Sequence, residues 1–168
     1  AYAGDSDFNV STTSELFSGL SVEKASLSLF ISDMPVGPFV IGQPYEVSVL
    51  LSAVDPGTLI PVGATITIGN GVDSCNAIVQ ADGSASCEIT PSSLAADDFV
   101  ASFAGDVDFN SVTSDPMAGP TINKADTQIS ISSSLNPGVE GSVIQFTADV
   151  SVVSPGAGEP SGSRQFYV

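Results

Sequence analysis

The chain has 168 residues, of which 42% are hydrophobic and 13% charged, so it can bury the core of one or two domains and is not a disordered polymer. Three basic against 19 acidic residues give a formal net charge of −16, which repels nucleic acid and anionic membrane surfaces and argues against both as partners. The chain contains no histidine and no apolar run of the about 20 residues needed to cross a bilayer, so histidine-based catalysis and membrane insertion are not expected.

Apolar and polar residues alternate in short stretches along the whole chain, which is the pattern of strands with one face buried in a sheet. In chain order, the clearest stretches are residues 27–31, 45–53, 99–103, 129–131 and 144–152. Turn signals separate them, among them Asp55-Pro-Gly and Asn136-Pro-Gly. No stretch shows the 3.6-residue apolar stripe of a helix.

This spacing of strands and turns predicts a fold class. Strands of about 5 to 8 residues with turns every 8 to 12 residues favour an all-β fold, with antiparallel sheets in an immunoglobulin-like β-sandwich. Two features of antibody domains are absent: the chain has no tryptophan, and its two cysteines are not widely separated.

The chain repeats itself at a spacing of about 100 residues. The landmarks are Gly4 with Gly105, Lys24 with Lys124, and Gly42 with Gly141, at spacings of 101, 100 and 99 residues. The repeat predicts tandem β-sandwiches: residues 1–21 as the C-terminal end of a preceding repeat, 22–114 as a complete repeat, 115–121 as a linker and 122–168 as the N-terminal half of a following repeat. The two partial pieces do not complement each other, so we expect the chain to be a segment of a longer tandem array.

Two sequence phrases resemble a known family. The segment PGVEGSVIQFTADVSVV, residues 137–153, resembles the opening of the bacterial Ig-like repeats often termed group 3. YAGDSDF at residues 2–8 and FAGDVDF at residues 103–109 are similar to that family's closing phrase, an aromatic residue followed by x-Gly-Asp-x-x-aromatic. The resemblance spans the whole chain and implies tandem Ig-like domains, which serve as stalk and spacer modules of large secreted adhesins, surface proteins and fibres.

The two closing phrases also carry a candidate ion site. Each has the form D-x-D-x-N, which places oxygen ligands at alternate positions as the first half of an EF-hand loop does, and so suggests calcium. The candidate ligands are Asp5, Asp7, Asn9, Asp106, Asp108 and Asn110. The glycine and the bidentate glutamate of a complete EF-hand loop are missing, and a plain hairpin turn at Gly105-Asp106 explains the same residues. In the calcium interpretation, Asp115, Asp126 or Glu23 would supply further ligands. No cofactor is required by any pattern in the chain.

Cys75 and Cys87 flank a strand-turn-strand pattern with Asp82-Gly83 at its tip. Two cysteines in an acidic, exported domain predict a disulfide. A two-residue turn would leave the two sulfur atoms about three residues out of register on neighbouring strands, so a bulge or a longer loop is expected.

The functional expectation is a protein without enzymatic activity. The serine runs contain no G-x-S-x-G motif, and the adjacent acids Asp97 and Asp98 would point to opposite faces of a strand. We expect an exported structural repeat of a stalk, fibre or filament, at the cell surface or outside the cell, whose partners are neighbouring Ig-like repeats. Its export signal would lie outside these residues. The alternative is an adhesin or carbohydrate-binding module that uses a sheet face or loops; the sequence names no host or surface ligand, and the absence of tryptophan disfavours sugar stacking.

Overall fold

The computed structural model describes residues 1–12, 21–95 and 97–167. Within these ranges every regular element is a strand, from β1 to β11, and none is a helix. All strand pairs except β2 with β9 run antiparallel. The prediction of an all-β fold built from antiparallel sheets is therefore confirmed.

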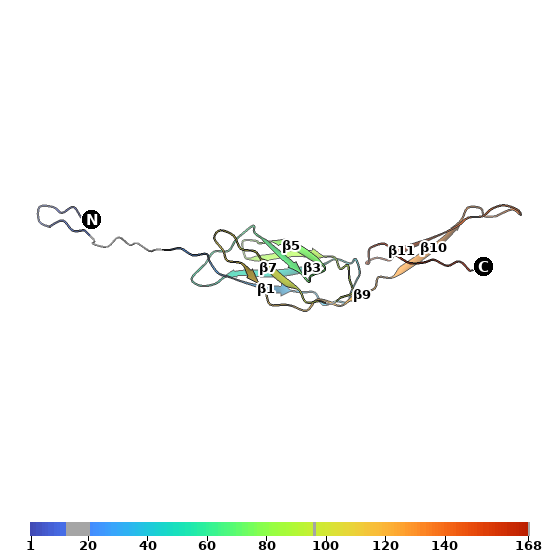
Figure 1. The fold of residues 1–168 in the computed structure, drawn as a ribbon, viewed down its shortest axis with the longest axis horizontal. Coiled ribbons are helices and arrows are strands. Elements are labelled where there is room, and N and C mark those ends of the chain that lie inside the picture. Colours follow the sequence, from blue (N-terminus) through green and yellow to red (C-terminus); the bar gives the residue numbers. More distant parts are fainter. Residues whose placement is uncertain (13–20, 96, 168) are drawn as a thin grey trace.

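Strands β1 to β9 form a central body, whose main parts are two sheets (Figure 1). One sheet has three strands in the order β1-β3-β6, and the other has four in the order β5-β4-β7-β8. The first is made of β1 (Leu27–Asp33), β3 (Tyr45–Ala53) and β6 (Ser84–Ile89). The second is made of β5 (Ser74–Ile78), β4 (Thr65–Gly69), β7 (Val100–Phe103) and β8 (Val112–Thr113).

The core lies between these two sheets because each strand turns alternate side chains toward the other sheet. In β3, Val47 and Val49 are fully buried, and in β4 Ile66 and Ile68 are as well. They belong to one hydrophobic cluster that also contains residues of β1 and β7. This burial is consistent with a β-sandwich, whereas an immunoglobulin-type topology stays a prediction.

The segment that was predicted to be a linker, residues 115–121, is bonded along the central body. Met117 exchanges both main-chain hydrogen bonds with Phe99, at 2.7 and 2.9 Å. The segment then leads into β9 (Ile122–Asn123), which lies parallel to β2 (Phe39–Val40). Ile122 is only 8% exposed and packs in the central hydrophobic cluster. These residues are therefore part of the body's surface and edge, and the predicted domain boundaries stay a prediction.

Beyond the central body, β10 (Thr127–Ser133) and β11 (Phe146–Val152) form a two-stranded antiparallel sheet. Its apolar side chains are largely exposed: Ile129 at 61%, Ile131 at 64% and Phe146 at 57%. In the central body, β1 and β3 pair in the same way, with Leu29 opposite Leu51 where β10 and β11 have Ile129 opposite Val150. Among the described residues of this sheet, Val150 and Val152 are half-buried, whereas the apolar side chains of β10 and of Phe146 are left largely uncovered.

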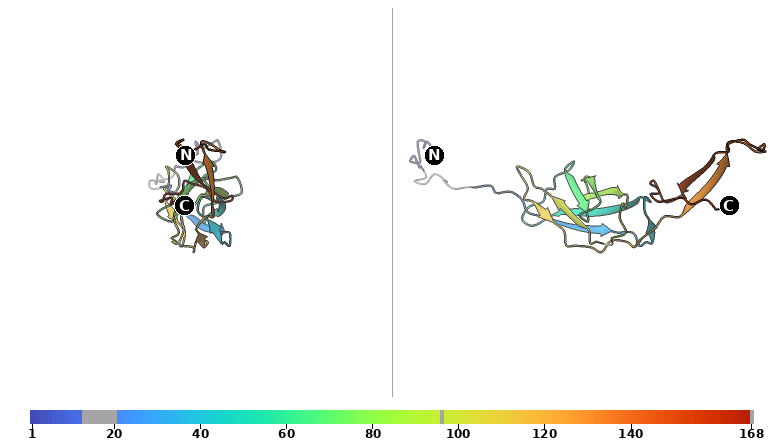
Figure 2. Two further views of the ribbon diagram at one scale, coloured as in Figure 1. Left: turned by 90° about the vertical axis from the view of Figure 1, so that its right-hand side faces the viewer. Right: turned by 45° about the vertical axis from the view of Figure 1, so that its right-hand side comes forward.

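The chain joins the central body at one end and leaves it at the other (Figures 1 and 2). It joins at Ala25, which is hydrogen-bonded to the loop between β7 and β8, and we name this the proximal end. It leaves through β9 beside β2, and we name this the distal end. Strand β1 runs from the proximal to the distal end. Successive segments therefore follow one another along the length of the molecule and do not fold back beside it.

We predict that Gly83→Ala destabilises the fold strongly. Gly83 has φ of 84°, and a Cβ atom there would collide with the carbonyl oxygen of Leu51 in β3. A left-handed alanine costs about 1–2 kcal/mol, and the collision adds about 1–3 kcal/mol, so we expect the free energy of unfolding in urea to fall by about 2–5 kcal/mol.

The matched control is Gly71→Ala. Gly71 has a similar φ of 87°, but no atom lies within 4 Å of the position of its Cβ. It should therefore lose only the backbone share of about 1–2 kcal/mol. Equal losses in the two variants would contradict the close packing of Gly83 against β3.

Candidate functional sites

The loop between β7 and β8 is a turn organised by the side chain of Asp106. Its Oδ1 atom accepts hydrogen bonds from the main-chain N–H groups of Asp108 and Phe109, both at 2.8 Å. The N–H of Asp106 in turn donates to the carbonyl oxygen of Phe109 at 3.0 Å. Gly105 precedes it with φ of 80°, a conformation that suits glycine. One carboxylate thus satisfies two loop N–H groups, as aspartates in such turns do.

The N-terminal loop has the same hydrogen bonds. Asp5 Oδ1 accepts from the N–H groups of Asp7 and Phe8, both at 2.9 Å, and the N–H of Asp5 donates to the carbonyl oxygen of Phe8 at 3.0 Å. Tyr2 and Ser11 exchange main-chain hydrogen bonds across this loop. Their positions correspond, 101 residues later, to the paired residues Phe103 and Val112 of β7 and β8.

One difference between the loops is the hydroxyl group of Tyr2. It donates to Asp5 Oδ2 at 2.6 Å, whereas the other loop has Phe103 at that position. This hydrogen bond, together with those from the N–H groups of Asp7 and Phe8, lowers the pKa of Asp5, because all of them favour the charged carboxylate. The same hydrogen bond raises the pKa of Tyr2.

The structure brings the calcium candidates together in two loops, but gives several of their oxygens other partners. The carbonyl oxygen of Asp106 accepts a hydrogen bond from the ammonium group of Lys24 at 2.5 Å, which places a positive charge against the loop. Asn110 turns its Nδ2 atom toward the carbonyl oxygen of Lys24 at 3.2 Å. Asp5, Asp7 and Asn9 lie in the exposed N-terminal loop. Among the described residues, no three acidic or cysteine side chains are grouped to hold a metal ion, Asp115, Asp126 and Glu23 included. Calcium binding stays a prediction.

The loop at Asp106 instead holds the chain where it joins the central body. The N–H of Ala25 donates to the carbonyl oxygen of Asp108 at 2.8 Å, and the N–H of Asn110 donates to the carbonyl oxygen of Ala25 at 2.9 Å. Lys24 adds its side-chain bond to Asp106. The contact between Lys24 and this loop was not predicted from the sequence. The available signal was that the lysine and the loop both recur at a spacing of about 100 residues.

The predicted disulfide is present and joins Cys75 to Cys87. The expected geometry was wrong in one respect, because the two cysteines do not lie on paired strands of one hairpin. Cys75 lies on β5, which pairs with β4, and Cys87 lies on β6, which pairs with β3 in the other sheet. The disulfide therefore ties the two sheets together along one side. No bulge is needed to bring the residues into register, since β5 and β6 belong to different sheets.

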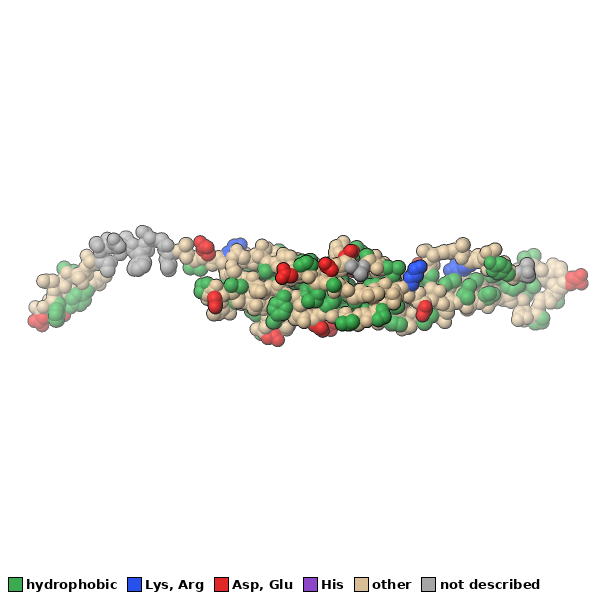
Figure 3. Space-filling view, turned by 90° about the horizontal axis from the view of Figure 1, so that it is seen from below, with side chains coloured by type: hydrophobic (Ala, Val, Ile, Leu, Met, Phe, Trp, Pro, Cys, Tyr) green, Lys and Arg blue, Asp and Glu red, His purple; other side chains and the backbone are tan. Residues whose placement is uncertain are grey.

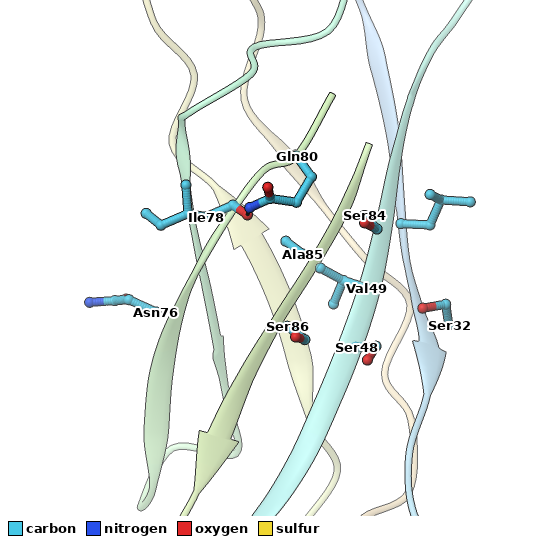
Figure 4. Close-up of a pocket in the computed structure, with 10 residues that line it drawn as sticks. Ser32, Ser48, Val49, Asn76, Ile78, Gln80, Ser84, Ala85 and Ser86 are labelled. Carbon is cyan, nitrogen blue, oxygen red and sulfur yellow. Dashed lines mark hydrogen bonds between the residues drawn. The ribbon is translucent and has the colours of Figure 1, made fainter. Parts of the chain in front are cut away.

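A shallow cavity of about 520 Å³ lies beside this disulfide-linked pair of strands (Figure 4). Ser48 on β3 and Ser84 and Ser86 on β6 line one side, and Asn76 and Ile78 on β5 line the other. The remaining described lining residues are Ser32, Val49, Leu50, Gln80 and Ala85. None of these described residues carries a charge, although the chain has a net charge of −16. We name it the serine groove. It offers hydroxyl and amide groups but no acid, base or nucleophile pair.

No protein-family model, curated protein or solved structure matches this chain. The resemblance to bacterial Ig-like repeats therefore stays a prediction. In the part of the chain that the structure describes, no helix is long and apolar enough to cross a membrane.

We predict that Asp106→Ala lowers the free energy of unfolding by about 1 kcal/mol, because two loop N–H groups lose their acceptor. Asp106→Asn should recover most of this loss, since an amide keeps the Oδ1 acceptor. Asp108 bonds to Ala25 through its main-chain carbonyl, so Asp108→Ala is the matched control and should change stability by less than about 0.5 kcal/mol. Thermal unfolding of the three variants makes the comparison.

The same melts test the calcium interpretation. An ion site would raise the melting temperature when calcium replaces EDTA, and both Asp106→Ala and Asp108→Ala would abolish that rise. A turn without an ion predicts no calcium effect in the parent chain.

We predict that the double variant Cys75→Ala, Cys87→Ala loses about 3 kcal/mol of unfolding free energy, because the disulfide restricts a loop in the unfolded chain. Urea unfolding should also show a steeper dependence on denaturant, since the unfolded variant exposes more surface. Reduction of the parent chain should reproduce both effects. If the reductant changed the urea unfolding of the double variant as much as that of the parent chain, the effect would not come from this disulfide.

Proposed function

We propose that this chain is a non-enzymatic structural segment of an extracellular stalk, fibre or filament, in which Ig-like repeats follow one another end to end and act as a rigid spacer between other modules. The observation that carries the proposal is the way the central body holds the chain at both of its ends. Main-chain hydrogen bonds fix Ala25 at the proximal end and Thr121 and Asn123 at the distal end, and such bonds restrict bending at these points more than a free linker does.

At the distal end, the outgoing chain is paired with β2. The N–H of Phe39 donates to the carbonyl oxygen of Thr121 at 2.9 Å, and the N–H of Ile41 donates to that of Asn123 at 3.0 Å. A third hydrogen bond, 3.2 Å from the N–H of Ala157 to the carbonyl oxygen of Ile41, reaches from the loop that follows β11. The sheet of β10 and β11 is thus bonded to the central body on two sides of the connection.

At the proximal end, the incoming chain is held by the Asp106 loop as described above. The two ends lie at opposite poles of the central body (Figure 2). The loop motifs and the strand pairs that recur about 100 residues apart support successive units of one kind. A run of such units would extend along one direction.

Composition supports a location outside the cell. A disulfide persists in oxidising compartments, and the excess of acidic side chains, scattered in red over the face shown in Figure 3, would keep a long exposed polymer dispersed by charge repulsion.

The serine groove favours a second candidate function, an adhesin or carbohydrate-binding module. Its hydroxyl and amide groups could form hydrogen bonds with a neutral, hydroxyl-bearing ligand such as a glycan. No aromatic side chain is among its described lining residues, so stacking on a sugar ring is not provided there. We therefore place this candidate second.

The spacer function is tested by lengthening the chain by one unit. A duplicated chain, residues 1–121 followed by residues 22–168, preserves the repeat spacing and should be longer than the parent by about 40 Å in small-angle X-ray scattering, roughly the length of a sandwich of nine-residue strands with their loops. The control carries a flexible glycine-serine insert of about ten residues at the duplication point, and its scattering should show bending between units.

A duplicated chain that does not lengthen, or that matches the flexible control, would contradict the spacer function. Binding of the parent chain to a defined glycan, lost on Ser86→Arg in the serine groove, would favour the second candidate.

A further inference from the structure

The distal end of the central body is a socket for the loop that follows β11. Ala157 bonds to the carbonyl oxygen of Ile41, and a Cβ atom on the neighbouring Gly42 would collide with the main chain of Ala157. Gly42 is therefore required for the approach. A cavity of about 440 Å³ surrounds this contact and is lined on the side of the central body by Ile41 and by residues 92–94. We name Ile41, Gly42 and residues 92–94 the distal socket.

The inserted surface has a simple composition. It consists of Lys124 and Ala125, which follow β9, and the loop residues 156–159, all at or beside the cavity. Glycine is needed at position 156 because a Cβ atom on that residue would collide with the Cβ atom of Ala125. Close approach thus depends on small residues in both partners.

The proximal end of the central body carries a corresponding surface, about 100 residues earlier. Lys24 and Ala25 correspond to Lys124 and Ala125, and residues 56–59 correspond to residues 155–158, with Thr58 and Leu59 in place of Ala157 and Gly158. The packing within the surface also corresponds, since the Cβ position of Gly57 lies 3.5 Å from Ala25 Cβ, as that of Gly156 lies against Ala125. Here the surface is open: Leu59 is 73% exposed, and a cavity of about 630 Å³ is lined by Lys24, Ala25 and residues 56–59. We name these residues the proximal plug.

We propose that the proximal plug docks into the distal socket of another copy of this domain. We infer the occupant of the socket from the contact that Ala157 already makes with Ile41 and Gly42 within the chain, because the plug is equivalent in sequence to the loop that contains Ala157. In the docked pair, Thr58, the counterpart of Ala157, would donate its N–H group to the carbonyl oxygen of Ile41 in the other copy. Gly42 of that copy would leave the space for it, as it does for Ala157.

The lysines mark corresponding places in the two surfaces. Lys24 and Lys124 are two of only three basic residues in the chain, and Lys124 lines the socket cavity together with Ser92 and Ser93. The plug and the socket are different surfaces at opposite ends of the domain, so docking has a direction, head to tail.

This inference rests on the proposed tandem function, and the duplicated chain of residues 1–121 followed by 22–168 tests it separately. Ser93→Cys in the first copy and Thr58→Cys in the second place one thiol in the socket and one in the plug. A short bismaleimide should link them, while the native disulfide stays intact. The positive control is Ser93→Cys with Ala157→Cys in the parent chain, because both residues line the socket cavity. In the negative control, the second copy carries Ser28→Cys instead of Thr58→Cys. Ser28 is an exposed residue on the outer face of β1.

We expect the plug-socket pair to link about as fast as the positive control and about tenfold faster than the negative control, since docking raises the local thiol concentration above that of a loosely tethered pair. Gly42→Ala in the first copy should remove this advantage. Gly141→Ala in the second copy should not, because Gly141 has a similar φ of 84° with no atom near the position of its Cβ.

Linking no faster than the negative control, in a sample where the positive control links, would overturn the docking. If such a chain still lengthens in scattering, the spacer function stands without the docking. If it does not lengthen, the spacer function fails as well.

Discussion

Main-chain hydrogen bonding at the two ends of the central body is the constraint on which the arrangement of this molecule depends. The incoming chain is bonded at Ala25, and the outgoing chain is bonded along β2, so neither connection relies on one side chain. The side chains fit these contacts. Glycines such as Gly42 occupy the positions where two main-chain segments approach closely, and the Lys24 side chain donates a hydrogen bond to the Asp106 loop. Because backbone geometry sets the direction of each connection, a change of surface residues would leave the direction of the chain intact.

Much of the central fold could be predicted from local patterns. The alternation in residues 45–53 identified the buried face of β3, and Val47 and Val49 are indeed fully buried. The turn at Gly105-Asp106 was likewise readable, because glycine and aspartate have strong conformational and hydrogen-bonding preferences that act over a few residues. Such preferences need no knowledge of the rest of the molecule.

Contacts between distant segments were not readable in the same way. The cysteine pair was placed on one hairpin because Asp82-Gly83 signals a turn, yet β5 and β6, on either side of this turn, belong to different sheets. Thr121 was placed in a linker because proline and glycine precede it, yet its carbonyl oxygen accepts a bond from Phe39. Each outcome depends on which strand edge is free in the assembled body, and residue spacing alone does not encode that.

The disulfide between the two sheets also sets how far this domain can stretch. A pulling force applied through the chain ends enters near Ala25 and leaves near Ile122, and Cys75 and Cys87 lie between them on β5 and β6. If the domain unfolds under load, the disulfide prevents the 12 residue steps between the cysteines from extending. At about 3.4 Å per residue, this withholds about 40 Å of contour length, less the span of the bond itself. In the proposed array, each unfolded unit would thus extend less under load, and it would start refolding with its two sheets still joined.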